Sequence, residues 1–311
     1  MPEFEGKKLK QEIITRLEQI LTKDRIRQNE PMKNHTTFRV GGPADIFLTP
    51  SAEELPAVLS VCREEQMPVT VIGNGSNLLV GDQGIRGVVI CIGFGMRGIR
   101  VDGEKIFLEA GVTLAAAAQQ AAKAGLTGLE FASGIPGTFG GAVVMNAGAY
   151  GGEMKDVIVS VRVISEDGEI LTLSKEELDL SYRHSVIPER GYLVIDGELL
   201  LTREKDPDQI TERMEELKKK RIEKQPLEYP SAGSTFKRPE GYFAGKLIMD
   251  AGLRGFSVGG AAVSEKHCGF VINKGNATAA DICALMDEVT RIVKEKYAVT
   301  LEPEVKKVGE F

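Results

Sequence analysis

The stretch "VVICIGFGMRGIRVDG", residues 88–103, decides between two folds. Its Gly93, Gly95 and Gly98 spell G-x-G-x-x-G behind an apolar run, the pattern of a dinucleotide-binding turn in a Rossmann fold. In that fold the third glycine opens a helix, because N–H groups at the helix N-terminus hold the pyrophosphate. Here Gly98 leads into a hairpin strand, and Glu109 comes too early to be the acidic residue expected about 20 positions on. We therefore interpret the motif as coincidental and predict a different fold.

The flanking patterns predict a mixture of helices and short strands. Hairpins turning at Asp102-Gly103 and at Asp167-Gly168 are expected. A buried strand is expected at 67–73, and further strands are expected at 77–80, 87–92, 192–201, 234–237 and 269–273. Helices are expected at 8–22, from the Ser51/Glu54 capping pair to about 66, from Thr113 to 124, after the Ser174/Glu177 pair, at 207–224 and at 279–296. The apolar face of the first helix comprises Leu9, Ile13, Leu17, Ile20 and Leu21. The class is α+β.

Composition narrows the class of protein. The 311-residue chain is long enough for two or three cores, and its net charge of -6, without a basic block, argues against general nucleic-acid binding. No segment resembles a signal peptide or a membrane span, so we expect a cytoplasmic protein without membrane partners. The cysteines are far apart in sequence and are interpreted as reduced core thiols, and no metal site is expected.

Two glycine-rich bends are candidates for anion binding. The first follows a strand and comprises Gly73, Asn74, Gly75, Ser76 and Asn77. Its successive N–H groups could form a nest for a phosphate, although an ordinary Asn-Gly turn explains the pattern equally well. The second lies within residues 133–152, where a tight turn leads to Thr138 and a short helix with Gly140 and Gly141 in its first turn. A helix N-terminus with bare glycine suits a diphosphate, and the alternative is close helix packing.

Six motifs occur in an order that resembles a known family. They are "NHTTFRVGGPADIF", "VIGNGSNLLV", "GIPGTFGGAVVMNAGAYGGE", "LDLSYRHS", "SAGSTFKRP" and "LEPEV", within residues 30–307. Together they resemble the UDP-N-acetylenolpyruvoylglucosamine reductases, in the branch without the extra tyrosine loop. The resemblance implies an FAD-binding fold of the vanillyl-alcohol oxidase and p-cresol methylhydroxylase type, with a C-terminal α+β substrate-binding domain. The predicted domains are 1–205 for FAD, with subdomains of about 1–98 and 99–205, then 206–300 for substrate, and a tail 301–311 that returns to the active site.

The resemblance also implies the reaction and its residues. The enzyme would hold FAD noncovalently, take hydride from NADPH, and reduce UDP-N-acetylglucosamine enolpyruvate to UDP-N-acetylmuramate for peptidoglycan, and it would be a monomer. The implied catalytic residues are Arg183, Ser234 and Glu304. The implied substrate contacts are Tyr182, Lys237, Lys246 and Asn273. The implied cofactor contacts are Arg39, Gly73, Asn74, Gly75, Ser76, Asn77, Gly134, Ile135, Pro136, Gly137, Thr138, Gly140, Gly141, Ala147 and Gly148.

The chemistry explains why such residues are needed. Negative charge develops at the α-carbon of the enol ether and spreads into its carboxylate, and the forked Arg183 guanidinium suits that group. Ser234 is the implied proton donor, helped by Lys237, Lys246 or a water molecule, and a buried Glu304 with a raised pKa would polarise the intermediate. The alternatives are a flavin oxidase of the same fold and a noncatalytic nucleotide-sugar binding protein. Covalent flavin attachment would need a histidine, and neither bend contains one.

Overall fold

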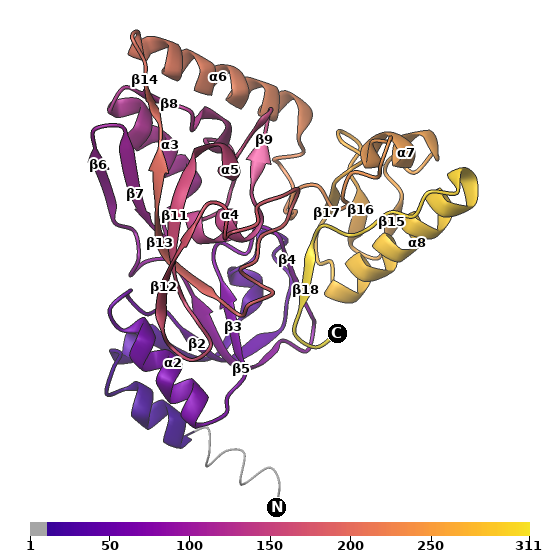
Figure 1. Ribbon diagram of the computed structural model, residues 1–311. Helices are drawn as coiled ribbons and strands as arrows, with labels where there is room; N and C mark the ends of the chain where they lie inside the picture. Colours follow the sequence, from indigo (N-terminus) through magenta and orange to yellow (C-terminus); the bar gives the residue numbers. More distant parts are fainter. Residues whose placement is uncertain (1–10) are drawn as a thin grey trace, which may run out of the picture. The chain divides into compact units, whose positions relative to one another are not determined.

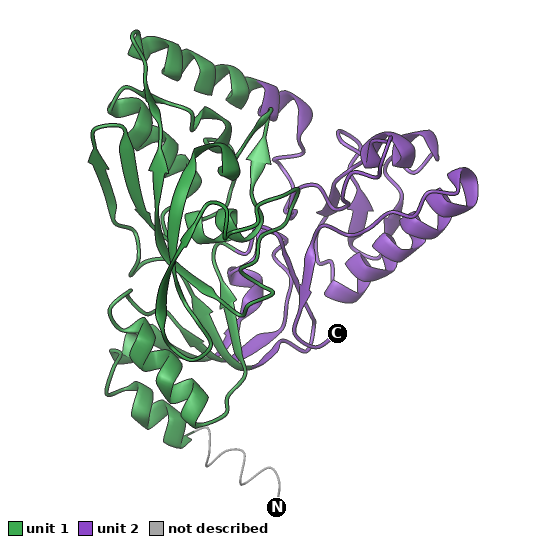
Figure 2. Cartoon of the chain, in the orientation of Figure 1, with its two compact units in different colours: residues 1–28, 46–74, 87–219 green, residues 29–45, 75–86, 220–311 purple. Residues whose placement is uncertain are grey.

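The computed structural model describes residues 11–311, which fall into two compact units (Figure 2). Unit 1 contains the described chain up to residue 28 together with Ile46–Asn74 and Gly87–Lys219. Unit 2 contains Asn29–Asp45, Gly75–Arg86 and Lys220–Phe311. The units therefore interleave along the sequence, whereas the predicted domains are continuous. The reason is long-range pairing inside unit 2, where β4 (Leu78–Val80) forms a parallel pair with β18 (Lys306–Val308).

The centre of unit 1 is a five-stranded sheet in the order β12-β11-β13-β7-β6 (Figure 1). The strands are β6 (Ile99–Asp102), β7 (Lys105–Glu109), β11 (Ile158–Ile164), β12 (Ile170–Ser174) and β13 (Leu193–Leu200). All neighbours in it are antiparallel. Both predicted hairpins are confirmed, with Gly103 and Gly168 at positive φ in the turns. Gly98 thus precedes strand β6 and not a helix, which confirms that the G-x-G-x-x-G pattern is coincidental.

Helices of unit 1 share one large apolar core with this sheet. They include α3 (Leu114–Lys123), where the Thr113 side chain accepts from the Ala116 N–H, and the short α4 (Phe139–Val144). α6 (Pro207–Lys224) matches the predicted helix, although the division between the units falls inside it. Residues 11–17 are helical and bury Ile13 and Leu17, while Leu9 lies outside the described residues. The Ser174/Glu177 pair forms both expected hydrogen bonds, but the chain makes only a turn there, so the predicted helix is wrong.

A second sheet has the order β1-β2-β5-β3. Its strands are β1 (Ile26–Pro31), β2 (Pro43–Leu48), β3 (Val69–Ile72) and β5 (Ile85–Cys91), and β3 runs parallel to β5. The expectation that β3 is buried is wrong, since Val69 and Val71 are 37% and 43% exposed. As the last strand in the order, β3 has a neighbour on one side only.

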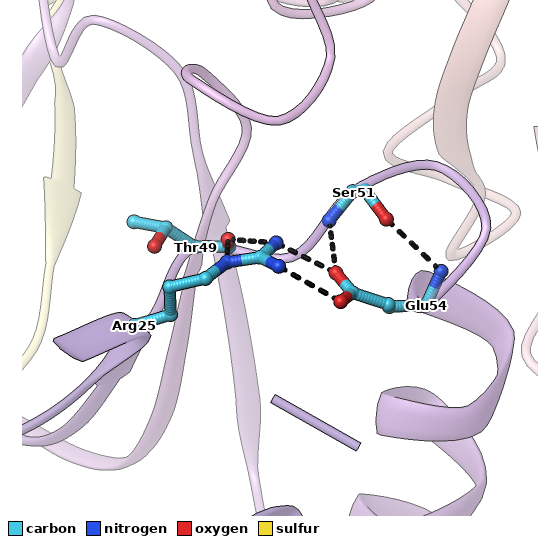
Figure 3. A network of polar contacts seen from close by, with 4 residues as sticks. All are labelled: Arg25, Thr49, Ser51 and Glu54. Atoms are coloured by element: carbon cyan, nitrogen blue, oxygen red, sulfur yellow. Dashed lines mark hydrogen bonds and ion pairs between the residues drawn. The ribbon is translucent and has the colours of Figure 1, made fainter. Parts of the chain in front are cut away.

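Helix α2 (Leu55–Glu64) is preceded by a network of four residues (Figure 3). Ser51 and Glu54 form the predicted reciprocal pair, at 2.8 and 3.4 Å, although the helix begins one residue after Glu54. Arg25 donates to both carboxylate oxygens of Glu54, at 2.8 and 2.6 Å, and twice to the Thr49 carbonyl, at 2.9 and 2.6 Å. A single guanidinium therefore joins the chain before β1 to the entry of α2.

Unit 2 has its own core, built on the sheet β15-β16-β17 and on helix α8. The elements are α7 (Ala244–Asp250), β15 (Ser257–Val258), β16 (Ala261–Val263), β17 (Val271–Asn273) and α8 (Ala279–Tyr297). α8 confirms the predicted final helix and starts with a Thr278/Asp281 capping box. Residues 234–237 are not a regular strand; their pairing with the tail amounts to an isolated β-bridge between Phe236 and Pro303.

The remaining elements are short. They are η1 (Lys23–Arg25), η2 (Met32–Asn34), η3 (Glu130–Ala132), α5 (Met154–Val157), and the strand pairs β8 (Leu126–Thr127) with β14 (Thr202–Arg203) and β9 (Gly148–Ala149) with β10 (Gly152–Glu153). Among residues 11–311, no helix is both long and apolar enough to cross a bilayer.

Candidate active site

The first glycine bend leaves several of its main-chain N–H groups without a hydrogen bond. Within the described chain, no hydrogen bond uses the N–H groups of Gly73, Asn74, Gly75 or Ser76. Gly75 has φ +60°, and a Cβ there would lie 2.0 Å from the His35 carbonyl oxygen in unit 2. Only glycine permits that approach, so this bend is specified more tightly than an ordinary Asn-Gly turn.

Within unit 1, the two predicted bends meet. The Asn74 side chain donates to the Pro136 carbonyl at 3.0 Å, and a Cβ on Gly73 would lie 2.4 Å from the Thr138 hydroxyl oxygen. Residues more than 60 positions apart in sequence are therefore in direct contact. The Asn74 side chain links the two bends, so its contribution to a ligand would come through its backbone.

The N-terminus of α4 differs in part from the prediction. Thr138 occupies the N-cap position, but its side chain makes no capping hydrogen bond. The N–H groups of Phe139 and Gly140 already donate to carbonyls of residues 112 and 110, at 2.7 and 2.8 Å. A Cβ on Gly140 would meet Ala110 at 3.0 Å, so close packing explains this glycine, whereas Gly141 is exposed and a Cβ there would make only an ordinary contact with the Thr138 hydroxyl oxygen at 3.6 Å. Packing thus gives Gly140 a structural role, and the predicted cofactor contacts of Gly140, Gly141 and the turn before Thr138 stay predictions.

The end of the glycine-rich segment is a small hairpin that the sequence analysis missed. Gly148 pairs with Glu153, and a Cβ on Gly148 would lie 2.7 Å from the Glu153 Cβ. Ala147 donates to the Ala142 carbonyl and accepts from the Met154 N–H. Ala147 and Gly148 are therefore both used within the protein's own packing and hydrogen bonding. The structure adds no support for their predicted contact with the cofactor.

Arg183 lies at the tip of a tight turn in unit 1. Ser181 and His184 exchange main-chain hydrogen bonds at 3.3 and 3.1 Å, and Arg183 between them has φ +56°. Its guanidinium carbon lies 5.3 Å from the centre of the Tyr182 ring. Tyr182 is 54% exposed and Arg183 is half-buried, so this turn presents a cation at the surface of unit 1.

The fully buried Asn146 holds this turn, and the sequence analysis missed it. Its amide nitrogen donates to Glu153 at 2.8 Å and to the Ser181 carbonyl at 3.0 Å, while its oxygen accepts from the Lys155 N–H at 2.9 Å. Asn146 has φ +38°, which asparagine tolerates better than most residues. Its position directly after a short helix was the available signal. Through Asn146 the Arg183 turn is connected to the glycine-rich segment.

In unit 2, the structure brings Ser234 and Glu304 together through paired main chain. The Glu304 N–H donates to the Thr235 carbonyl and the Lys237 N–H to the Glu302 carbonyl, both at 2.8 Å. Ser234 is exposed, and Glu304 is 8% exposed. Asn77, the last residue of the first bend, donates from its side chain to the Glu304 carbonyl at 3.2 Å. Three of the predicted residues are thus neighbours.

Of the predicted substrate contacts in unit 2, two lie on the surface and one is buried. Lys237 forms an ion pair with Glu302 at 3.2 Å, and Lys246 forms one with Asp250 at 2.8 Å, on exposed surface. Asn273 is 7% exposed; its amide donates to the Phe38 carbonyl, and its oxygen accepts from the N–H groups of residues 275 and 277. This arrangement gives Asn273 a structural role and leaves its predicted contact with the substrate without support.

A buried hydroxyl without a partner lies beside the first bend. Thr37 donates its N–H to the Gly75 carbonyl at 3.3 Å, and its hydroxyl oxygen is the buried side-chain polar atom that lacks a hydrogen bond among residues 11–311. An unsatisfied hydroxyl at this place, next to unbonded N–H groups, fits a site that a polar ligand completes. The residues present therefore fit the diphosphate of FAD. Arg39, two residues on, is exposed with φ +56°, and its predicted contact stays a prediction.

A hollow of about 590 Å³ in unit 1 is a different feature. It is lined by Thr127, Glu130, Glu204, Asp206, Gln209, Ile210, Glu212, Arg213 and Glu216. None of these is a predicted site residue, and the many carboxylates would repel a diphosphate. The hollow is therefore unsuited to FAD or to a nucleotide sugar.

All four cysteines are free thiols; Cys62 and Cys268 are buried as predicted, whereas Cys91 and Cys283 are only half-buried. Burial raises the pKa of Cys62 and of Cys91 to about 11 in each case. Because the thiolate is the reactive form, neither thiol has the character of a nucleophile.

Two family descriptions match the chain. Residues 43–174 match "FAD binding domain", and residues 225–308 match "UDP-N-acetylenolpyruvoylglucosamine reductase, C-terminal domain". The first contains the meeting bends, and the second contains the paired segments that carry Ser234 and Glu304.

Known proteins resemble the chain over most of its length. A UDP-N-acetylenolpyruvoylglucosamine reductase of Agathobacter rectalis is 60% identical over 296 residues, covering 91% of this chain and 94% of the relative. One of Lachnoclostridium phytofermentans is 56% identical over 303 residues, covering 96% and 97%. The crystal structure of the reductase from Thermus caldophilus superimposes with a TM-score of 0.77 at 38% identity, covering 91% and 98%. The chain belongs to the UDP-N-acetylenolpyruvoylglucosamine reductase family.

Proposed function

We propose that this protein reduces UDP-N-acetylglucosamine enolpyruvate to UDP-N-acetylmuramate in peptidoglycan synthesis, with FAD as cofactor and NADPH as hydride donor. The family match and the two relatives above support the FAD-dependent reduction. The observation that carries the proposal is the hydrogen-bonded arrangement in unit 2, in which Asn77 of the first bend contacts Glu304 and Glu304 pairs with the residue after Ser234. In the proposed reaction this arrangement would connect the main chain that holds the cofactor with two of the reacting side chains.

The bends would hold the cofactor by its diphosphate. Among residues 11–311, the N–H groups of residues 73–76 and of Gly141 and the Thr37 hydroxyl make no hydrogen bond within the protein, so they are available to a ligand. Main-chain donors bind phosphate without a neighbouring cation, which agrees with the scarcity of basic residues in both bends. When bound, FAD supplies the hydride that the β-carbon of the enol ether receives.

Three side chains would then act on the substrate. Arg183 holds the substrate carboxylate and stabilises the charge that develops there, an effect worth about 3 kcal/mol or more of transition-state energy. The exposed Ser234 donates a proton to the α-carbon. Glu304, held by its main chain against the Ser234 segment, polarises the intermediate. Tyr182, Lys237 and Lys246 are the exposed or half-exposed groups that would contact the nucleotide sugar.

The proposal extends to the organisation of the chain. Residues 1–205 would form the FAD-binding part, 206–300 the substrate-binding part, and 301–311 a tail that contributes Glu304. The protein would act as a cytoplasmic monomer, without nucleic-acid or membrane partners. Light scattering of the purified protein tests the monomer, with a molar mass of about twice 33.7 kDa as the contrary result.

Anaerobic absorbance spectroscopy tests the reaction. Addition of NADPH should bleach the flavin bands of the purified protein, and the enolpyruvyl nucleotide sugar should restore them without oxygen. In Ser234→Ala the bleaching should be normal, while the recovery should be at least about a hundredfold slower, because only the second half-reaction needs the proton. A colourless protein that ignores added FAD, or recovery of Ser234→Ala at the normal rate, would contradict the proposal.

A further inference from the structure

The segment that carries Ser234 is anchored on its other side by a histidine loop. The Thr235 N–H donates to the Gly269 carbonyl at 2.8 Å, and the Gly269 N–H donates to His267 Nδ1 at 3.1 Å. The Thr235 carbonyl in turn accepts the Glu304 N–H. Three hydrogen bonds therefore connect His267 with Glu304 through the main chain of two residues, Gly269 and Thr235, and Thr235 is the residue next to Ser234.

The geometry of the loop leaves the imidazole little freedom. The His267 ring contacts the edge of Phe270 with a centroid distance of 4.9 Å and an interplanar angle of 71°. A Cβ on Gly269 would lie 2.9 Å from His267 Cε1, and a Cβ on Gly245 in α7 would lie 3.5 Å from the same atom. Two glycines thus allow the main chain to approach the ring closely. The Thr235 hydroxyl adds a further tie, since it accepts from the Val271 N–H at 2.8 Å.

We propose that His267 is a positioning residue for the reduction: its neutral imidazole accepts the Gly269 N–H through Nδ1, and the loop so held keeps Ser234 beside Glu304. This inference rests on the proposed function. His267 acts through main chain and does not itself take part in proton transfer. The role requires an acceptor at Nδ1, and a protonated ring cannot supply one, because both of its nitrogens are donors.

The surroundings favour the neutral ring. Burial lowers the pKa of His267 below its ordinary value of 6.5, against a smaller main-chain effect that raises it. The charged and titratable groups on the loop and on the neighbouring elements have partners elsewhere or are themselves neutral. Lys246 pairs with Asp250, the Lys266 ammonium donates to the Ile222 carbonyl, Glu265 lies near Lys274, Arg254 donates to the Glu265 carbonyl, and burial raises the pKa of the Cys268 thiol.

The sign of the pH effect follows from this. A histidine whose pKa is lower in the folded protein stabilises the fold at pH values above its ordinary pKa. That stabilisation is lost as the pH falls through the pKa of the folded protein. On acidification the Gly269 N–H loses its acceptor, and the Ser234 segment loosens. The half-reaction that uses Ser234 should therefore slow at acid pH, while reduction of the flavin by NADPH should not slow for this reason.

Two substitutions separate the two ring nitrogens. In His267→Asn the amide oxygen stands at the position of Nδ1 and accepts at every pH used, whereas in His267→Gln the polar atoms stand at the position of Nε2. The assay is stopped-flow reoxidation of the NADPH-reduced enzyme by the enolpyruvyl nucleotide sugar between pH 5 and 8. His267→Gln should reoxidise about tenfold more slowly at neutral pH. His267→Asn should stay within about threefold of the unmodified enzyme, with a flatter acid limb.

The outcomes distinguish this inference from the proposed function. If the unmodified enzyme is not reoxidised by the substrate, the proposed function fails. If it is reoxidised and His267→Gln matches it, or His267→Asn is as slow as His267→Gln, the positioning role is refuted. Should either variant not fold, hydrogen exchange of the unmodified holoenzyme decides. After correction for intrinsic rates, the Gly269 and Thr235 amides should exchange faster at acid pH, and unchanged protection would refute the role.

Discussion

Replacing Gly73 by alanine should weaken FAD binding because the new methyl group would separate the two bends. A Cβ at this position lies 2.4 Å from the Thr138 hydroxyl oxygen, and the next atoms of Thr138 lie 3.5 and 3.6 Å away. Thr138 is 2% exposed, so it cannot swing out into solvent. Overpacking of this kind costs about 1–3 kcal/mol. If the strain is relieved by moving the bends apart, the dissociation constant of FAD should rise roughly 5- to 150-fold.

A second substitution shows whether this clash is the cause. Thr138→Ala removes the hydroxyl and leaves only the contact at 3.5 Å. Adding Gly73→Ala to the Thr138→Ala protein should therefore weaken FAD binding much less than Gly73→Ala weakens it in the unmodified protein. Gly103→Ala is the control for replacing a glycine, because a Cβ there meets nothing within 4 Å and the hairpin lies away from both bends. Its φ of +61° should cost about 1–2 kcal/mol of folding stability and leave FAD binding unchanged.

The assay is titration of the flavin-free protein with FAD, followed by flavin fluorescence, for the four members of the double-mutant cycle. Thermal unfolding of each flavin-free variant measures the folding contribution separately. Additive effects of the two substitutions would refute the reasoning, and so would a Gly73→Ala protein that binds FAD as tightly as the unmodified one.

Three shorter predictions follow from other contacts. Thr37→Val removes a buried hydroxyl without a partner, so the flavin-free protein should melt at the same or a higher temperature while FAD binds about fivefold or more weakly; equal affinity would show that the hydroxyl does not contact the cofactor. Arg25→Met should lower the free energy of unfolding by about 1–3 kcal/mol. Burial raises the pKa of Glu54, while Arg25 and Ser51 together lower it by more, so its net pKa is below 4.5. The stabilisation that the Arg25–Glu54 pair gives to the folded protein is therefore present above pH 4.5 and declines on acidification. Chemical denaturation of both proteins at pH 7 and pH 4 measures it. Cys62, which is 1% exposed and has a pKa of about 11, should react with a thiol reagent at pH 8 only after unfolding, whereas the half-buried Cys91, with the same pKa, should react slowly in the native protein; fast labelling of Cys62 in the native protein would contradict its burial.

Local patterns in the sequence were sufficient for much of the fold. The hairpins around Gly103 and Gly168 and the helices at 114–123, 207–224 and 279–297 were predictable, because turn glycines, caps and apolar periodicity act over a few residues. The turn after Ser174 shows the limit. Its capping pair forms as expected, yet no helix follows, because a cap stabilises a helix only where the next residues continue it.

The candidate site was predictable as a set of residues, but the reasons for several of them were not. Ser234, Glu304 and the two bends came from motifs that resemble a family. That Gly140 and Gly148 serve packing, and that Asn273 serves three main-chain groups, depends on atoms from distant segments. Asn146, Thr37 and His267 were overlooked for the same reason, since nothing in the adjacent residues shows what their polar atoms contact.

The amino-acid sequence alone determined where the chain turns, which segments are helical and that the G-x-G-x-x-G pattern precedes a strand, because each of these depends on neighbouring residues. Only the tertiary structure decided that Asn74 donates to Pro136 and that Glu304 pairs with Thr235. The same holds for the hydrogen bonds that link His267 through Gly269 to Thr235. Those contacts join residues far apart in sequence, and their geometry exists only once sheets, helices and glycine-permitted close approaches have formed together.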